Sequence, residues 1–486
     1  MSQRSKLGLL LAASALCLPV HAGAETLRDA LLKAYNSNPT LTGARAGQRA
    51  NDENVPIARS TGLPNVSVSG LYNENVQNTS LSAGSLPGRT ASGTANLSVP
   101  IFLGGAVSNA VGGAKARVES GQADLRSAEA NVFTAVVAAY MDVIRTQAIV
   151  DLNRKQVRVL TVNLQATRDR FEVGDLTRTD VAQSEARLAL AQAQLQQAES
   201  QLIAAKENYV QLVGTEPDAL DAPPALPNLP SSPDTAVAVA LKNNPDLISA
   251  ARARDAARYD VGVARATRLP KLYAVGSSSY TDNLNSLPPG LPSAAQWNSY
   301  KATTAGAQLT IPIFQGGGPS ARIRQAQARQ SQAIEREIAV ERGVIASARS
   351  AFANWQASNQ VIKSAQIAVQ ASTLALEGVR AENSVGTRTI LDVLNAEREL
   401  LNAQVDLVTA QRNSYVAGFQ LLAAMGRAEA RDLGLDGGPL YDPTTNYRRV
   451  HGIYWDWDQD PKPAAKATRT VDSKPQTSDI SAPPAK

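Results

Sequence analysis

The chain has 486 residues, with 48 basic and 43 acidic side chains, a net charge of +5, two histidines and one cysteine. The basic residues are dispersed among acidic ones, so the charge pattern predicts no nucleic-acid partner. Cys17 and His21 lie in a predicted signal peptide and His451 lies in the C-terminal tail, so the mature sequence excludes a histidine-based metal site, a catalytic triad and thiol chemistry. It therefore predicts a protein that is not an enzyme and holds no metal or cofactor.

Residues 1–24 have the pattern of a secretory signal peptide. Two basic residues precede an apolar run over residues 7–20, and the small residues Ala22, Gly23 and Ala24 supply a cleavage site. We therefore expect the chain to be exported and exclude this segment from the fold.

Residues 25–230 and 231–435 are two copies of one structural repeat. The segment LSVPIFLGG from Leu97 returns as LTIPIFQGG from Leu309, and the Val-Gly pair at Gly174 returns at Gly386. Both pairs are separated by the same number of positions, which is typical of a duplicated rigid unit. Each copy is predicted to hold short helices, a β-hairpin and a long helical hairpin.

Residues 436–486 form a C-terminal tail. After about residue 460 it is rich in Pro, Ala, Lys, Ser and Thr and has few large apolar residues, so we expect it to be largely disordered. We also expect truncation after Asp460 to leave assembly and transport intact.

Each repeat has two segments with period-two alternation, the weak signature of membrane β-strands. In the first repeat they lie near residues 66–73 and 95–101, and in the second near 272–280 and 305–311. Four strands cannot close a barrel, which needs roughly eight, so the sequence favours a barrel shared between copies. A soluble periplasmic sheet is the alternative. No window of the sequence reaches the ~18 consecutive apolar residues of a membrane helix, so we expect any membrane span to consist of strands.

Four helical arms are predicted because proline is absent from residues 101–216 and 320–438. Gly174 and Gly386 would reverse the chain, and Thr179, Asp180 or Thr389 would cap the returning helices. An arm of this length would extend roughly 100 Å, enough to reach across a compartment. A solitary coiled coil with a solvated face remains an alternative. The arms are expected at residues 104–171, 176–213, 316–383 and 389–425.

The segment VGTRTILDVLNA, from Val385 to Ala396, resembles the periplasmic tip motif of the TolC family of outer-membrane efflux and type I secretion channels. The resemblance extends over roughly residues 25–434. It implies a mixed fold, in which a homotrimer shares one twelve-stranded outer-membrane β-barrel with four strands per chain. A long periplasmic α-helical coiled-coil barrel with a small α/β equatorial belt would continue it.

The resemblance also implies a function and partners. The trimer would be a passive exit duct in the outer membrane, with a periplasmic extension. It would carry secreted proteins or toxic small molecules from an inner-membrane ABC or proton-driven transporter through a periplasmic adaptor protein, and its barrel would contact outer-membrane lipid. The alternative from another class is a soluble periplasmic coiled-coil scaffold or adaptor.

The resemblance assigns a periplasmic gate near the tips. It implies that Arg388 ties its hairpin to Thr179 and Asp180 and that Asp392 forms a carboxylate ring. Helical spacing would place Arg388, Asp392 and Asn395 on one face. The chain departs from the family at Asn383, where relatives place a tyrosine, and at Asn395, where they place a second acid, so we expect a weaker lock and one cation-attracting ring. The implied adaptor-docking tips are Val173, Gly174, Asp175, Val385, Gly386 and Thr387.

Overall fold

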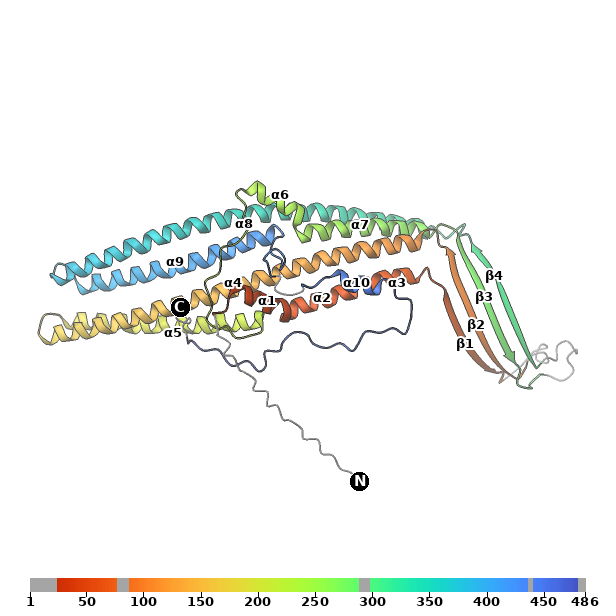
Figure 1. Cartoon of the computed structure of the whole chain (residues 1–486), viewed down its shortest axis with the longest axis horizontal. Helices are drawn as coiled ribbons and strands as arrows, with labels where there is room; N and C mark the ends of the chain where they lie inside the picture. The colour runs from red at the N-terminus through yellow and green to blue at the C-terminus, as the bar shows by residue number, and fades with distance from the viewer. Residues whose placement is uncertain (1–23, 77–86, 288–297, 436–439, 480–486) are drawn as a thin grey trace, which may run out of the picture.

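The computed structural model describes residues 24–76, 87–287, 298–435 and 440–479. The described chain is elongated, with a sheet at one end and the turns of two helical hairpins at the other (Figure 1). All but the last residue of the predicted signal peptide lies outside the described residues.

Among the described residues, four strands form one antiparallel sheet in the order β1-β2-β3-β4. The expected strand pairs are confirmed, and Gly70 pairs with Gly93 in the first hairpin. The register of β2 against β3 shifts between Pro100 and Phe102, where proline lacks the amide needed to continue the ladder. The sheet is therefore open, with β1 and β4 as its edges. The strands are β1 (Asn65–Glu74), β2 (Arg89–Phe102), β3 (Lys271–Asp282) and β4 (Ser299–Thr310).

Two long helical hairpins follow the two halves of the sheet. Each begins after a glycine in the left-handed region, Gly105 at φ 78° and Gly317 at φ 79°, which turns the chain from strand to helix. The predicted arms are confirmed to within about two residues at most ends. The first hairpin consists of α4 (Ala106–Glu172) and α5 (Arg178–Val213), and the second of α8 (Gly318–Ser384) and α9 (Ile390–Ala424).

The helices lie side by side in one curved layer. Toward the tips the contacts give the order α5-α4-α9-α8, and toward the sheet α7 (Pro245–Ala266) lies between α4 and α8. On the other side of α4 lie α2 (Pro39–Asp52) and α3 (Asn54–Ser60). One edge of the layer is therefore α8, and the other consists of α2, α3 and α5.

A belt of short elements lies beside the middle of the long helices. The hydroxyl oxygen of the fully buried Tyr140 lies 2.8 Å from each of the carbonyl oxygens of Glu25 and Asp221, which share its single proton. Glu25 and Leu220 form a parallel β-bridge, which joins the start of the described chain to the linker between repeats. Each buried aromatic side chain here stabilises the belt by roughly 1.5–3 kcal/mol. The belt helices are α1 (Leu27–Ser37), α6 (Pro233–Asn243) and α10 (Thr444–Val450).

One described helix, α4, includes an 18-residue window long and apolar enough to cross a membrane by composition, which the sequence analysis did not predict. Of that window, 56% is buried within the chain.

The described part of the tail makes contacts with the rest of the chain, and its expected disorder stays a prediction. Residues 452–479 contain no helix or strand, yet several of their backbone groups are hydrogen-bonded to the first hairpin. Whether the tail is dispensable stays a prediction.

Candidate functional site at the hairpin tips

The two hairpins end in matching open turns. Gly174 has φ 84° and Gly386 has φ 81°, and nothing lies within 4 Å of the place where a Cβ would stand on either residue. The valines that precede them, Val173 and Val385, are 80% and 73% exposed. The tips thus present small, partly apolar surfaces that no described part of the chain covers.

A capping box opens each returning helix. The Thr177 side chain accepts a hydrogen bond from the Asp180 amide, and the Asp180 carboxylate accepts one from the Thr177 amide at 2.9 Å. Thr389 and Asp392 repeat this arrangement at 3.0 Å. Each threonine hydroxyl also donates to the aspartate carboxylate, and this hydrogen bond is the main cause that lowers the pKa of both aspartates. Thr389 is confirmed as a cap, but the prediction for Thr179 was wrong, because Thr177 holds that position.

Arg388 lies just before the helix on whose face the sequence analysis placed it. The N-cap is Thr389, so Arg388 precedes α9 and does not share a helical face with Asp392 and Asn395. Its Nε donates to Glu382 at 2.7 Å, a contact that raises the pKa of the guanidinium. The structure of the single chain therefore places Arg388 on the end of its own hairpin and not against Thr179 or Asp180. Asn383 donates to the Arg388 carbonyl at 2.8 Å and steadies the same turn.

Asn395 joins the two hairpins. Arg187 on α5 donates to its side-chain oxygen at 3.0 Å, and the contact is partly buried. An aspartate at this position would ion-pair with Arg187, whereas asparagine accepts the hydrogen bond without charge. The sequence analysis described Asn395 only as the absence of a second acid, whereas in the structure its side chain also joins the two hairpins.

Glu397 is a second inter-hairpin contact, one that the sequence analysis did not single out. Its side chain is only 2% exposed, and its Oε1 accepts from Asn163 on α4 at 2.9 Å and from Arg380 on α8 at 3.0 Å. The signal was available, since Glu397 lies one turn from the buried Val393 and from the buried Leu401, on the core stripe of α9.

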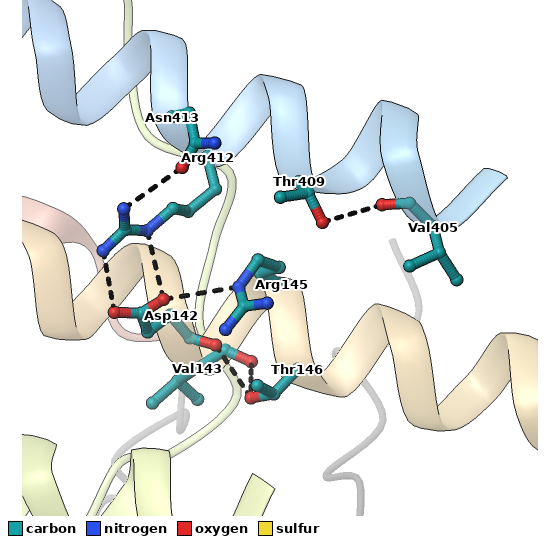
Figure 2. Close-up of polar contacts among 8 residues, drawn as sticks. All are labelled: Asp142, Val143, Arg145, Thr146, Val405, Thr409, Arg412 and Asn413. Atoms are coloured by element: carbon teal, nitrogen blue, oxygen red, sulfur yellow. Dashed lines mark hydrogen bonds and ion pairs between the residues drawn. The ribbon is translucent and has the colours of Figure 1, made fainter. Parts of the chain in front are cut away.

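A third contact lies closer to the belt. Arg412 on α9 donates through two nitrogens to the two carboxylate oxygens of Asp142 on α4, at 3.0 and 2.9 Å (Figure 2). Arg145 also donates to Asp142, at 3.3 Å (Figure 2). The bidentate geometry fixes α9 against α4 in one register. Polar contacts between the hairpins therefore recur from the tips to the belt.

The described residues offer no cluster of three or more metal-binding side chains. The groups gathered at the tips are helix caps, ion pairs and exposed carboxylates. Such an arrangement holds two hairpins together.

Comparison with known proteins identifies the family. The outer membrane efflux protein family matches residues 30–215 and 236–427, one match to each repeat. The outer membrane efflux protein BepC of Brucella suis is 35% identical over 430 residues, covering 88% of this chain and 90% of the relative. The outer membrane protein TolC of Vibrio cholerae is 28% identical over 417 residues, covering 84% and 92%.

Solved structures share the fold. The Campylobacter jejuni CmeC outer membrane channel superposes with a TM-score of 0.73 at 19% identity, covering 88% of this chain and 89% of that one. The fold prediction and the resemblance to TolC-family channels are confirmed, and the alternative of a soluble scaffold finds no support. The chain belongs to the outer membrane efflux protein family and is a channel protein of the outer membrane that extends into the periplasm.

Proposed function

We propose that three copies of the chain form one exit duct through the outer membrane and the periplasm. Secreted proteins or toxic small molecules would enter it passively from an inner-membrane ABC or proton-driven transporter through a periplasmic adaptor. The observation that supports this most is the open sheet of the described residues, because its four strands are too few to close a barrel and leave the outer edges of β1 and β4 without a partner strand. Twelve strands from three copies remove both edges.

The helical layer supports the same assembly. Only five of the 67 residues of α8 are buried in the single chain. Its uncovered side chains include Val361, Ile367 and Leu374, which are apolar and at least half exposed. If the α8 edge of one copy packs on the α2, α3 and α5 edge of the next, the layer closes into a tube. This head-to-tail contact is heterologous, since it joins two different surfaces. It gives a closed ring only if the rotation between successive copies brings the third copy back to the first.

We place the periplasmic entrance at the tips. Three symmetry-related Asp392 carboxylates would form a ring that attracts cations and excludes anions. Arg388 would moderate this ring, and Thr179 and Asp180 on the neighbouring hairpin would complete the gate. The contact between Arg187 and Asn395 at 3.0 Å would hold the two hairpins of a copy together beside it.

Single-channel recording of the purified protein tests the entrance. Asp392→Asn should reduce cation preference, and its amide oxygen can still cap α9, so the fold is retained. Arg388→Ser should raise conductance because it removes the cation that pairs with Glu382 in the turn. Asp151→Asn is the matched control, since Asp151 lies on α4 within the first hairpin and pairs with Lys155. Unchanged conductance and selectivity in both tip variants would refute the gate, and absence of any conductance in the unmodified protein would refute the duct.

A further inference from the structure

The described end of the chain lies on the first hairpin in an ordered way. Residues 468–479, here called the C-terminal strap, run along α5 from its end toward the tip. The Lys474 amide donates to Glu216 at 3.0 Å, and the Gln476 amide donates to Glu207 at 3.0 Å. Two carboxylates thus accept the backbone N–H groups of the strap.

Two cationic side chains bind backbone carbonyl oxygens of the strap. Lys206 donates through Nζ to the carbonyl oxygens of Thr477 at 2.9 Å and Asp479 at 2.7 Å. Arg154 on α4 donates to the Ser478 carbonyl at 3.2 Å and is held by Glu199 at 2.8 Å. These hydrogen bonds involve only backbone atoms of the strap. A site that recognises an extended peptide whatever its side chains uses contacts of the same kind.

Lys206 shows that the strap completes this site. The residue is only 6% exposed, and its ammonium donates to two backbone carbonyls, while the charge of the Asp479 carboxylate partly offsets the effect of burial. Burial lowers its pKa, as expected for a cation removed from water. Its two described hydrogen-bond acceptors are both carbonyls of the strap, so the strap replaces the water that the ammonium would otherwise bind.

The N-terminal end of the strap also packs closely against the chain at the end of α5. The Thr468 hydroxyl lies 2.6 Å from the position that a Cβ would take on Gly214, so only glycine permits this approach. Thr468, Thr470 and Ser473 then line a cavity of about 400 Å³ together with Asn38 at the start of α2.

The second hairpin lacks every one of these groups. If Gly174 and Gly386 are aligned, Lys206 corresponds to Gly418 and Glu207 corresponds to Phe419. The linker between repeats fills this place, because Leu226 lies against Gly418 and Tyr415 donates to the Pro224 carbonyl at 3.1 Å. The remaining counterparts of Arg154, Glu199 and Glu216 are Gln366, Gln411 and Ala428.

We propose that Arg154, Lys206, Glu207 and Glu216 form a binding site for an extended peptide on the first hairpin, and that the C-terminal strap is its resident ligand in the same chain. The strap covers this face and competes with any other peptide for it. The second hairpin, which lacks the four groups, does not bind the strap.

Hydrogen exchange on the full-length protein in detergent tests the site. The amides of Lys474 and Gln476 should exchange about tenfold more slowly than in a free peptide of residues 468–479, since each donates to a carboxylate. Lys206→Met should abolish this protection and leave exchange in α9 unchanged. Lys155→Met is the matched control, because Lys155 neighbours Arg154 but pairs with Asp151. Exchange at the free-peptide rate in the unmodified protein, or protection that survives Lys206→Met, would overturn the proposal.

A second experiment tests whether the ligand belongs to the same chain. Gln211 and Ser473 line the same cavity and lie outside the four binding groups. In the variant Gln211→Cys with Ser473→Cys, a short bis-maleimide should give an internal link that keeps the denatured chain at monomer mass. A ladder of linked dimers and trimers would overturn binding within one chain. Neither readout depends on conductance, so failure here leaves the exit duct untouched.

Discussion

At the scale of single residues, the returning helices depend on two threonines. Thr177 and Thr389 each accept a hydrogen bond from the amide three residues later, and an aspartate at that later position returns a hydrogen bond. The boxes set where α5 and α9 begin, and therefore where the turns at the tips end.

Thr389→Ala should weaken the first turn of α9 by about 1 kcal/mol, because a capping hydroxyl is lost. Amides in that turn should then exchange with solvent about fivefold faster, as measured by mass spectrometry. Thr409→Ala is the control, since Thr409 bonds only to the Val405 carbonyl within the helix (Figure 2). Equal exchange at the start of α9 in both variants would contradict the capping role.

Glu129 predicts a measurable pH dependence. It lies partly buried on α4, where its Oε1 accepts from the Ala430 amide at 2.7 Å, and burial raises its pKa above the ordinary 4.5. The folded state thus holds the proton more tightly than the unfolded state, and stability falls as pH rises from 4.5 through the raised pKa. In Glu129→Gln, which keeps the acceptor oxygen, that fall should be absent.

Thermal unfolding between pH 4.5 and pH 8 checks this against the exposed carboxylate variant Glu335→Gln. A slope with pH that is the same in the unmodified protein, Glu129→Gln and Glu335→Gln would rule out the assigned role.

Glu397 and Arg388 show where sequence reasoning fails at this scale. Charged residues on a long helix are usually solvated, and Glu397 departs from that rule because burial depends on which helices cross there. The helical face assigned to Arg388 was wrong because the cap one residue later, Thr389, starts the helix after it. Side-chain partners depend on the packing of distant segments, which spacing along one helix does not specify.

At the scale of elements, the sequence carried far more information. Proline is absent from the interiors of the arms, and a glycine marks each turn, so the limits of α4, α5, α8 and α9 follow from local stereochemistry. The strands were found but their ends were placed less well, because β2 and β4 each begin six residues before the alternating residues. The strap was missed, since its contacts use backbone groups that composition does not reveal.

Gly386→Val tests the tip as an element. Valine is strained at φ 81°, and its side chain would project into open space beside Val385. If the tips dock an adaptor, export should be lost while trimer yield and helical content stay unchanged. Gly378→Val, within α8 and also free of neighbours, is the matched control. Loss of folding in Gly386→Val alone would indicate that this glycine serves only the turn.

At the scale of the whole molecule, the proposed assembly would depend on the α8 edge. Leu374 is 70% exposed in the single chain, and the proposed contact would bury it against the next copy. Leu374→Arg should therefore abolish trimers, because an unpaired guanidinium would be desolvated there. Light scattering of the detergent-purified protein measures the mass.

Val162→Arg is the control, since Val162 is similarly exposed but lies on α4, which has other helices of the same chain on both sides and is not an edge of the layer. Trimers that persist in Leu374→Arg would place the contact elsewhere.

The open edges of the sheet also constrain the order of events during biogenesis. The outward backbone groups of β1 and β4 have no partner strand in the described part of the chain, and a bilayer offers them no water. A single copy that entered the lipid alone would expose both rows, at a cost of several kcal/mol for each unsatisfied group. Copies should therefore meet before or while their strands insert. The rate of membrane insertion should then rise more steeply than in proportion to the concentration of folded single chains, unlike that of a barrel closed by one polypeptide.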